Sequence, residues 1–191
     1  MPRTEEQYKD IREQRRAIIK DTAMEMFAEK GFAGTSISSI AKKAGISKGL
    51  MYNYFTNKED LIKTIILDGF NIVVEVFDAN KDGKLTREEL IFFVKETSNI
   101  LKANVSFWRL YFIVMMQADV IKLIENEFMD FLMPLLTTLI KYFENQGVEN
   151  PEAHARLLGA TLDGISLNYV VDPEHFPIDE VTDLIIDKFL K

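Results

Sequence analysis

Apolar residues recur at helical spacing through nearly the whole chain. Early in the sequence Ile19, Ala23 and Phe27 stand four residues apart, which places them on one face of a helix. This pattern predicts a helix over roughly residues 10–30 that ends at Gly31, because glycine commonly terminates helices. No segment alternates apolar and polar positions as a strand would, so we expect an all-α fold.

A group of short helices follows, separated by a glycine. A helix capped by Thr35 or Ser36 precedes Gly45. Ser47 can then cap a third short helix that ends near Thr56. Two helices joined by a tight turn that contains glycine form a helix-turn-helix. The residues expected to pack inward are Ile37, Ile40, Ala41, Ile46, Met51 and Phe55.

Helical spacing continues to the end of the chain. A fourth helix is predicted over about residues 57–77, and another begins after residue 87. The stretch "SFWRLYFIVMMQ" is apolar nearly all round, which indicates a buried helix. Residues 119–147 form one long helical pattern in which Pro134 should introduce a kink or break. Two more helices complete the chain, and the first of them starts near Pro151.

Charge is distributed unevenly along the chain. The formal net charge is −7. Residues 1–64 carry 12 Lys and Arg against 9 Asp and Glu, whereas the remaining residues carry 11 against 21. A basic N-terminal part attached to an acidic body fits a DNA-reading end, although ordinary surface variation produces similar asymmetry.

The composition also excludes several classes of function. The chain contains no cysteine, which excludes disulfides, thiolate metal sites and cysteine nucleophiles. The two histidines, His154 and His175, stand in no nucleophile motif, so we do not expect an enzyme. The N-terminus is polar, unlike a secretory signal, and the apolar runs fall far short of the roughly 20 residues that span a bilayer. We therefore expect a cytoplasmic protein.

The helix-turn-helix belongs to a longer and more specific pattern. The segment "AMEMFAEKGFAGTSISSIAKKAGISKGLMYNYFTNKEDLI" resembles the N-terminal domain of the TetR family of bacterial transcriptional regulators. The resemblance implies a helix-turn-helix DNA-binding domain over residues 1–63, of which roughly the first nine residues form a flexible arm. It implies a helical effector-binding and dimerisation domain over residues 64–191.

The resemblance also implies which residues contact DNA. They are Thr35, Ser36, Ser38, Lys48, Gly49, Leu50, Tyr52, Asn53, Tyr54 and Lys58. The start of the second helix carries Thr35, Ser36 and Ser38. The front of the recognition helix carries Lys48, Gly49 and Leu50. Phosphate-binding positions of the family match Tyr52, Tyr54 and Lys58. Simple packing is the alternative for the two tyrosines. Leu50 is less polar than a direct reader needs, but it can meet a thymine methyl group.

The family resemblance implies that the last two helices pair with those of a second subunit in a four-helix bundle. Two segments independently show wide apolar faces, made by Leu157, Leu158, Thr161, Leu162, Ile165, Leu184, Ile185 and Phe189. A core within one chain is the alternative use of these residues. Because a two-fold dimer matches a palindromic operator, we expect a homodimer on double-stranded operator DNA.

The middle of the chain is rich in aromatic residues and methionine. The members of this group are Phe107, Trp108, Tyr111, Phe112, Met115, Met116, Phe128, Phe131 and Leu132. Such residues line pockets for apolar ligands, and they equally form ordinary core. Few polar groups stand nearby, so the sequence favours an apolar or amphipathic small-molecule effector.

The stretch "FDANKDGKLTREEL" differs from the helical patterns around it. It fits the calcium-loop pattern D-x-[DN]-x-[DN]-G-x5-E and resembles an EF-hand over residues 78–89. The predicted calcium ligands are Asp78, Asn80, Asp82, the carbonyl of Lys84, Thr86 and Glu89. A solvated linker between two helices is the alternative, because Asp, Asn and Gly also favour turns.

Two functions fit these patterns. The first is a DNA-binding transcriptional regulator, a repressor that a small apolar or amphipathic effector releases from DNA, with a structural calcium site. The second is a calcium-binding helical sensor or interaction protein without DNA binding, which leaves the helix-turn-helix unexplained.

Overall fold

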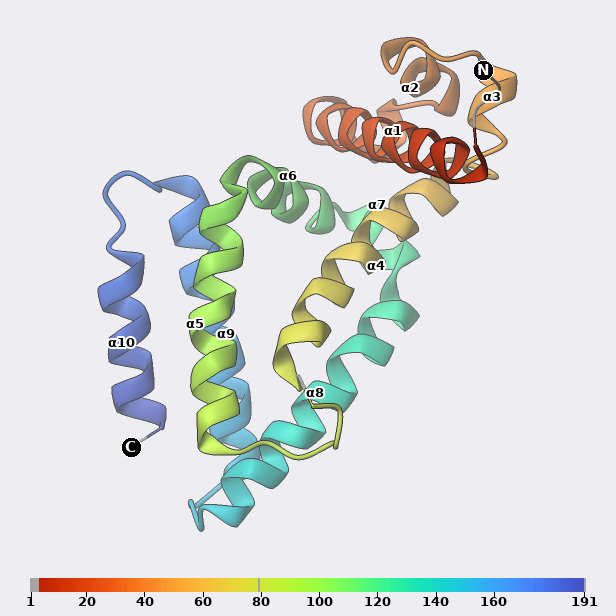
Figure 1. Cartoon of the computed structure of the whole chain (residues 1–191). Helices are drawn as coiled ribbons and strands as arrows, with labels where there is room; N and C mark the ends of the chain where they lie inside the picture. The colour runs from red at the N-terminus through yellow and green to blue at the C-terminus, as the bar shows by residue number, and fades with distance from the viewer. Residues whose placement is uncertain (1–3, 79, 191) are drawn as a thin grey trace. The chain divides into compact units, whose positions relative to one another are not determined.

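The computed structural model describes residues 4–78 and 80–190, which form helices joined by short turns (Figure 1). The helices are α1 (Glu5–Gly34), α2 (Ile37–Lys43), α3 (Lys48–Met51), α4 (Lys58–Phe77), α5 (Arg87–Ala103), α6 (Val105–Met115), α7 (Ala118–Leu123), α8 (Glu125–Asn145), α9 (Pro151–Val171) and α10 (Ile178–Phe189). No residue in the described ranges lies in a strand, and the predicted all-α fold is confirmed.

The chain divides into two compact units. The first unit comprises Met1–Leu67 and Leu110–Ile124, and the second comprises Asp68–Arg109 and Glu125–Lys191. This division differs from the predicted boundary between residues 63 and 64. The difference arises because the end of α6 and all of α7 pack with the N-terminal helices, a long-range association that leaves no local trace in the sequence.

The first helix begins earlier than its apolar pattern predicts. The Thr4 hydroxyl accepts a hydrogen bond from the Gln7 N–H (3.3 Å), and Gln7 Oε1 accepts one from the Thr4 N–H (3.1 Å). This reciprocal capping box stabilises the start of a helix. Residues 5–9, predicted to belong to a flexible arm, are therefore helical.

Gly31 interrupts α1, at the position where the sequence predicts its end. Its φ of 74° suits glycine, which has no Cβ to clash. The side chain of Gln117, the N-cap residue of α7, spans the interruption. Gln117 Oε1 accepts from the Phe32 N–H (2.7 Å), and its Nε2 donates to the Phe27 carbonyl (2.8 Å). Backbone groups on both sides of the interruption thus gain partners.

Most of the residues predicted to pack inside the helix-turn-helix are buried. These are Ile40, Ala41, Met51 and Phe55, whereas Ile37 and Ile46 are half-buried. The recognition helix α3, however, is shorter than predicted and ends at Met51. After it the N–H groups of Asn53 and Tyr54 bond to the carbonyls of Leu50 and Met51 (3.1 and 3.0 Å), three residues back. This tighter turn replaces the α-helical bonding to the fourth preceding residue.

The second unit is a helical bundle in which α5, α9 and α10 run side by side (Figure 1). Its core contains Phe77, Leu90, Phe93, Val94, Leu136, Leu139, Phe143, Leu158 and Ile185. Polar groups add specific ties between helices. The hydroxyls of Ser98 and Thr182 lie 2.7 Å apart in a buried position, which links α5 to α10. Arg109 Nε donates to the Val170 carbonyl (2.7 Å).

The long helical pattern over residues 119–147 is divided at Ile124, between α7 and α8. The expected kink or break at Pro134 is not where the division falls, because α8 runs through this proline as one helix. The hydroxyl of Thr138 donates to the Pro134 carbonyl (3.0 Å) within that helix. Apolar residues beyond the proline, such as Leu136 and Leu139, are buried in the core and hold the helix in place.

Candidate nucleic-acid interface

The exposed N-terminal end of α2 is the first part of the predicted DNA surface. Ser36 caps α2: its hydroxyl accepts from the Ser39 N–H (3.1 Å), and Ser39 Oγ accepts from the Ser36 N–H (3.1 Å). Ser36 and Ser38 are both exposed. Free N–H groups and the helix dipole at such an end favour a phosphate group.

The recognition segment, residues 48–54, is the second part. Met51 and Phe55 are buried and fix its inward side, while the Ser47 hydroxyl caps α3 by accepting from the Leu50 N–H (3.1 Å). The predicted base-reading and phosphate-binding residues that remain exposed are Lys48, Gly49, Tyr52 and Asn53. Leu50 and Tyr54 are half-buried. The segment therefore presents polar and aromatic groups on a rigid base.

Thr35 does not belong to this exposed set, which corrects the sequence-based assignment. Its side chain is buried (2% exposed), and its hydroxyl contacts the carbonyls of Gly31 (2.9 Å) and Met26 (3.2 Å). The hydroxyl is used inside the first unit because it satisfies carbonyls at the interruption of α1. It has no access to a phosphate.

Lys58, also predicted to contact phosphate, is held against α1. Its Nζ donates to the Phe32 carbonyl (2.9 Å) and lies 4.3 Å from the centre of the Phe32 ring. A cation over an aromatic face is attracted by the ring quadrupole. The hydrogen bond to Phe32 uses one of the three N–H groups of the ammonium, so the others stay available for a phosphate.

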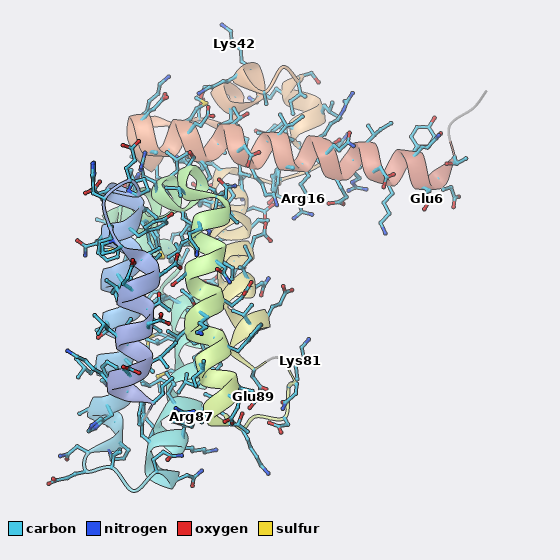
Figure 2. All side chains as sticks on the ribbon, turned by 60° about the vertical axis from the view of Figure 1, so that its left-hand side comes forward. Glu6, Arg16, Lys42, Lys81, Arg87 and Glu89 are labelled. Carbon is cyan, nitrogen blue, oxygen red and sulfur yellow. The ribbon has the colours of Figure 1, made fainter. Side chains whose placement is uncertain are left out.

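Two lysines in the last turn of α2 add positive charge that the sequence reasoning did not assign. Lys43 Nζ lies 2.9 Å from a carboxylate oxygen of Glu25 on α1. This hydrogen bond raises the pKa of the Lys43 ammonium, so the group stays charged. Lys42 projects outward from α2 (Figure 2).

A hollow of about 480 Å³ lies beside the recognition segment. Its lining includes Tyr8, Arg12, Arg15, Leu50, Asn53 and Tyr54. The first three come from α1 and were not predicted to contact DNA. Helical spacing between Tyr8 and the basic run "REQRR" could have predicted this shared face. It was not predicted because Tyr8 was expected to lie in a flexible arm.

The predicted effector-binding residues are divided between the two units. In the second unit Phe70 stacks on Phe131 with ring centres 4.2 Å apart, and Phe128 lies 6.0 Å from Phe70. Phe107 packs edge-on against Trp108 at 5.2 Å, and the Trp108 indole N–H donates to the Ile100 carbonyl. Leu132 is half-buried. The stacked phenylalanines form an aromatic cluster on α4 and α8.

In the first unit the remaining members of that set have different environments. Tyr111 is buried, and its hydroxyl donates to the Ile66 carbonyl (2.9 Å), which identifies it as core. Phe112 and Met115 are half-buried. Met116 is 68% exposed.

The predicted calcium loop connects α4 to α5. Asp78 Oδ2 accepts from the N–H of Gly83 (2.9 Å), whose φ of 73° permits the sharp turn. Asp82 Oδ1 accepts from the Lys84 N–H (2.8 Å). Leu85, the apolar residue of the loop, packs against the core of the second unit.

Most side-chain oxygens of the loop accept hydrogen bonds from other groups of the same loop. Glu89 Oε2 accepts from the N–H and the hydroxyl of Thr86 (both 2.8 Å), and Glu89 Oε1 accepts from Asn80 Nδ2 (2.6 Å). Figure 2 shows Glu89 at the start of α5, near the loop that carries Lys81. In contrast, Asp78 Oδ1 is buried and has no hydrogen-bond partner. A buried carboxylate oxygen without a partner is unfavourable.

The donor types of the loop suit calcium, but its side chains do not converge in this conformation. Among the described residues, no three Asp, Glu, His or Cys side chains are arranged to hold a metal ion. Glu89 would have to release both Asn80 and Thr86 before its two oxygens are free for a cation. The buried Asp78 Oδ1, by contrast, already lacks a hydrogen-bond partner.

The helices expected to form the dimer interface expose apolar side chains on their outer faces. Leu157, Leu167 and Val171 on α9 and Leu184 on α10 are each at least half exposed. Leu158 and Ile185, by contrast, are buried in the core of the second unit. A Cβ added at Gly164 would meet no atom within 4 Å. This face therefore has room for the close approach of another helix.

The N-terminal part of the chain matches a known sequence family. Residues 19–65 match the model of the tetR family of bacterial regulatory proteins. The chain is 34% identical over 76 residues to the fatty acid metabolism regulator protein of Bacillus subtilis, which covers 40% of this chain and 39% of that protein. It is 29% identical over 127 residues to the transcriptional repressor KstR2 of Rhodococcus jostii, covering 64% of this chain and 58% of that protein. The aligned part thus spans well under two thirds of either relative.

The fold as a whole also has a known counterpart. The structure of the regulator FadR from Bacillus subtilis in complex with stearoyl-CoA superposes with a TM-score of 0.71, covering 92% of this chain and 97% of that one at 19% identity. At this identity the similarity concerns the fold. The relatives are regulators and not enzymes, and no described helix is long and apolar enough to cross a membrane. The sequence match to the tetR family of bacterial regulatory proteins thus covers residues 19–65, and the similarity over the rest of the chain is one of fold.

Proposed function

We propose that the chain is a cytoplasmic DNA-binding transcriptional regulator of the TetR type that represses by occupying operator DNA. The observation that carries this proposal is the exposed recognition segment on a buried base, within residues that match the family. The similarity to KstR2, a protein named as a repressor, favours repression over activation.

The proposed regulator acts as a homodimer through α9 and α10. Exposed Leu157, Leu167 and Leu184, together with the open space at Gly164, offer an apolar helix surface. Two such surfaces can pack across a two-fold axis, which places two recognition segments on the two halves of a palindromic site.

The proposed effector is amphipathic and carries a long acyl chain, with acyl-CoA as the first candidate. The aromatic cluster of Phe70, Phe128 and Phe131 offers apolar surface for such a chain. A protein of the same fold binds stearoyl-CoA, and a sequence relative is a fatty acid metabolism regulator. Effector binding would weaken DNA affinity only if the effector prefers the conformation that does not bind DNA.

DNA binding and effector response are tested together. The wild-type chain should select a duplex from a random-sequence pool, bind it with an affinity that falls as salt rises, and release it when stearoyl-CoA is added. Phe131→Ala should reduce the response to stearoyl-CoA, whereas Phe92→Ala, an exposed phenylalanine on α5, should not. Absence of salt-dependent duplex binding contradicts the regulator and leaves the calcium sensor. Binding that ignores stearoyl-CoA contradicts the effector alone.

We also propose that residues 78–89 bind a calcium ion that stabilises the connection between α4 and α5. Asp78, Asn80, Asp82, Thr86 and Glu89 would supply side-chain oxygens, and Lys84 would supply its carbonyl. The buried, unpartnered Asp78 Oδ1 supports this proposal. A bound cation would neutralise the loop carboxylates and fix the loop between the two helices.

A further inference from the structure

The α1 side of the hollow beside the recognition segment lies outside the part of the chain that matches the family. Tyr8, Arg12 and Arg15 line it from α1, and all three precede residue 19, where the family match begins. The opposite wall is formed by Leu50, Asn53 and Tyr54 of the recognition segment and the turn after it. The start of α1 and the recognition segment therefore share one continuous concave surface within the first unit.

Helix geometry aligns the α1 side of this surface. Residues 8, 12 and 15 follow the i, i+4, i+7 spacing, which places their side chains in one stripe. The capping box at Thr4 makes this stripe helical from its first turn. A flexible start of the chain would leave Tyr8 without a fixed position relative to the recognition segment.

The two arginines carry positive charge that the described part of the chain does not neutralise. Arg12 and Arg15 are exposed, and neither forms an ion pair with another described residue. The neighbouring Arg16 is used differently, since its guanidinium lies 5.3 Å from the centre of the buried Phe55 ring. This contact holds α1 against the recognition segment and fixes the direction in which the stripe faces.

We infer that Arg12 and Arg15, assisted by the Tyr8 hydroxyl, bind the phosphate backbone of the same duplex that the recognition segment reads. This inference rests on the proposed DNA binding. Guanidinium groups suit phosphate because they donate paired hydrogen bonds in a fixed plane. Continuity with Asn53 and Tyr54 favours DNA over an acidic protein partner, because one duplex can occupy both walls. The interface thus extends N-terminal to the helix-turn-helix along α1.

Salt dependence of binding tests this inference. Each phosphate contact contributes about 0.9 to the slope of log affinity against log salt concentration. Arg12→Ala and Arg15→Ala should each reduce the slope for the selected duplex by about one, and the double variant by about two. Arg12→Lys should keep most of the slope because it keeps the charge. Lys95→Ala removes an exposed cation from α5 in the second unit and should leave the slope unchanged.

A second measurement reports proximity rather than affinity. Because the chain has no cysteine, Arg12→Cys and Lys95→Cys each create a single attachment point for a DNA-cleaving iron chelate. At low salt the probe at residue 12 should cut the selected duplex at the edge of its protected region, and the probe at residue 95 should not cut it.

The outcomes separate this inference from the proposed function. Wild-type binding with unchanged slopes for Arg12→Ala and Arg15→Ala overturns the phosphate contact but keeps the regulator. An equal loss of slope in Lys95→Ala overturns it too, because the effect would then reflect net charge. Absence of cleavage from residue 12 excludes proximity and would leave an acidic protein as the occupant. A wild-type chain that binds no duplex overturns both proposals.

Discussion

Two polar side chains of the first unit, Thr35 and Gln117, act as internal hydrogen-bonding groups at the interruption of α1. Thr35 contacts the Gly31 and Met26 carbonyls, and Gln117 joins Phe32 to Phe27. Leaving such groups unpaired in a partly buried place costs free energy. At this scale, the stability of the first unit depends on polar residues as well as on its apolar core.

Thr35→Val replaces the hydroxyl with a methyl group of similar size. We expect it to lower the free energy of unfolding by about 1–2 kcal/mol, because two carbonyl contacts are lost. Urea denaturation measures this change. The affinity for the selected duplex at fixed salt concentration should equal that of the wild type because the hydroxyl is buried. A reduced affinity with unchanged stability would restore Thr35 as a phosphate contact.

Gln117→Ala leaves the Phe32 N–H and the Phe27 carbonyl without their side-chain partners. The free energy of unfolding should fall by about 1–3 kcal/mol. Gln14→Ala, at an exposed position of α1, is the matched control and should change it by less than about 0.5 kcal/mol. Equal effects of the two substitutions in chemical denaturation would show that the Gln117 bridge contributes nothing.

At the scale of elements, Glu89 at the junction of α4 and α5 has two roles, which are helix capping and the proposed binding of calcium. In the present conformation Glu89 caps α5 by accepting from Thr86, whereas in the proposed calcium complex its oxygens bind the ion. Gln can keep the capping function, because Glu and Gln both occupy the third position of a capping box. Substitution at this residue can therefore separate helix capping from metal binding.

Glu89→Gln should abolish calcium binding while keeping the helix. For the wild type, titration calorimetry should detect one site, and calcium at about 100 times its dissociation constant should add about 2.7 kcal/mol of stability that a chelator removes. Glu88→Gln, an exposed neighbour at no ligand position, should retain both effects. Absence of calcium heat and of any shift in melting temperature for the wild type would leave residues 78–89 as a linker.

At the scale of the molecule, the proposed dimerisation and the proposed DNA binding place different demands on the same chain. The exposed apolar face of α9 and α10 has no use in a monomer, and it suits a two-fold partner. The open space at Gly164 allows a substitution to test this surface without disturbing the protomer, since an added Cβ meets nothing within 4 Å.

Gly164→Leu should preserve the helical fold and weaken the dimer. A larger side chain prevents close approach of helices across the interface, while in the protomer it replaces a residue that weakens helices by about 1 kcal/mol. Sedimentation velocity should show a shift toward monomer, and circular dichroism should show unchanged helix content. Lys141→Leu, exposed on α8, should leave the assembly unchanged. A Gly164→Leu dimer as tight as the wild type would move the interface elsewhere.

The sequence by itself determined that the chain is helical, that it contains a helix-turn-helix, and that Ile40, Ala41, Met51 and Phe55 pack inward, because local periodicity, caps and glycines encode these features. It also identified the oxygen donors of the loop, whose spacing is local. Only the tertiary structure decided that Thr35 is buried, that Lys58 rests on Phe32, and that α7 joins the first unit through Gln117. It also brought Arg12 and Arg15 beside Asn53. These features depend on contacts between residues far apart in the chain, which no periodic pattern records.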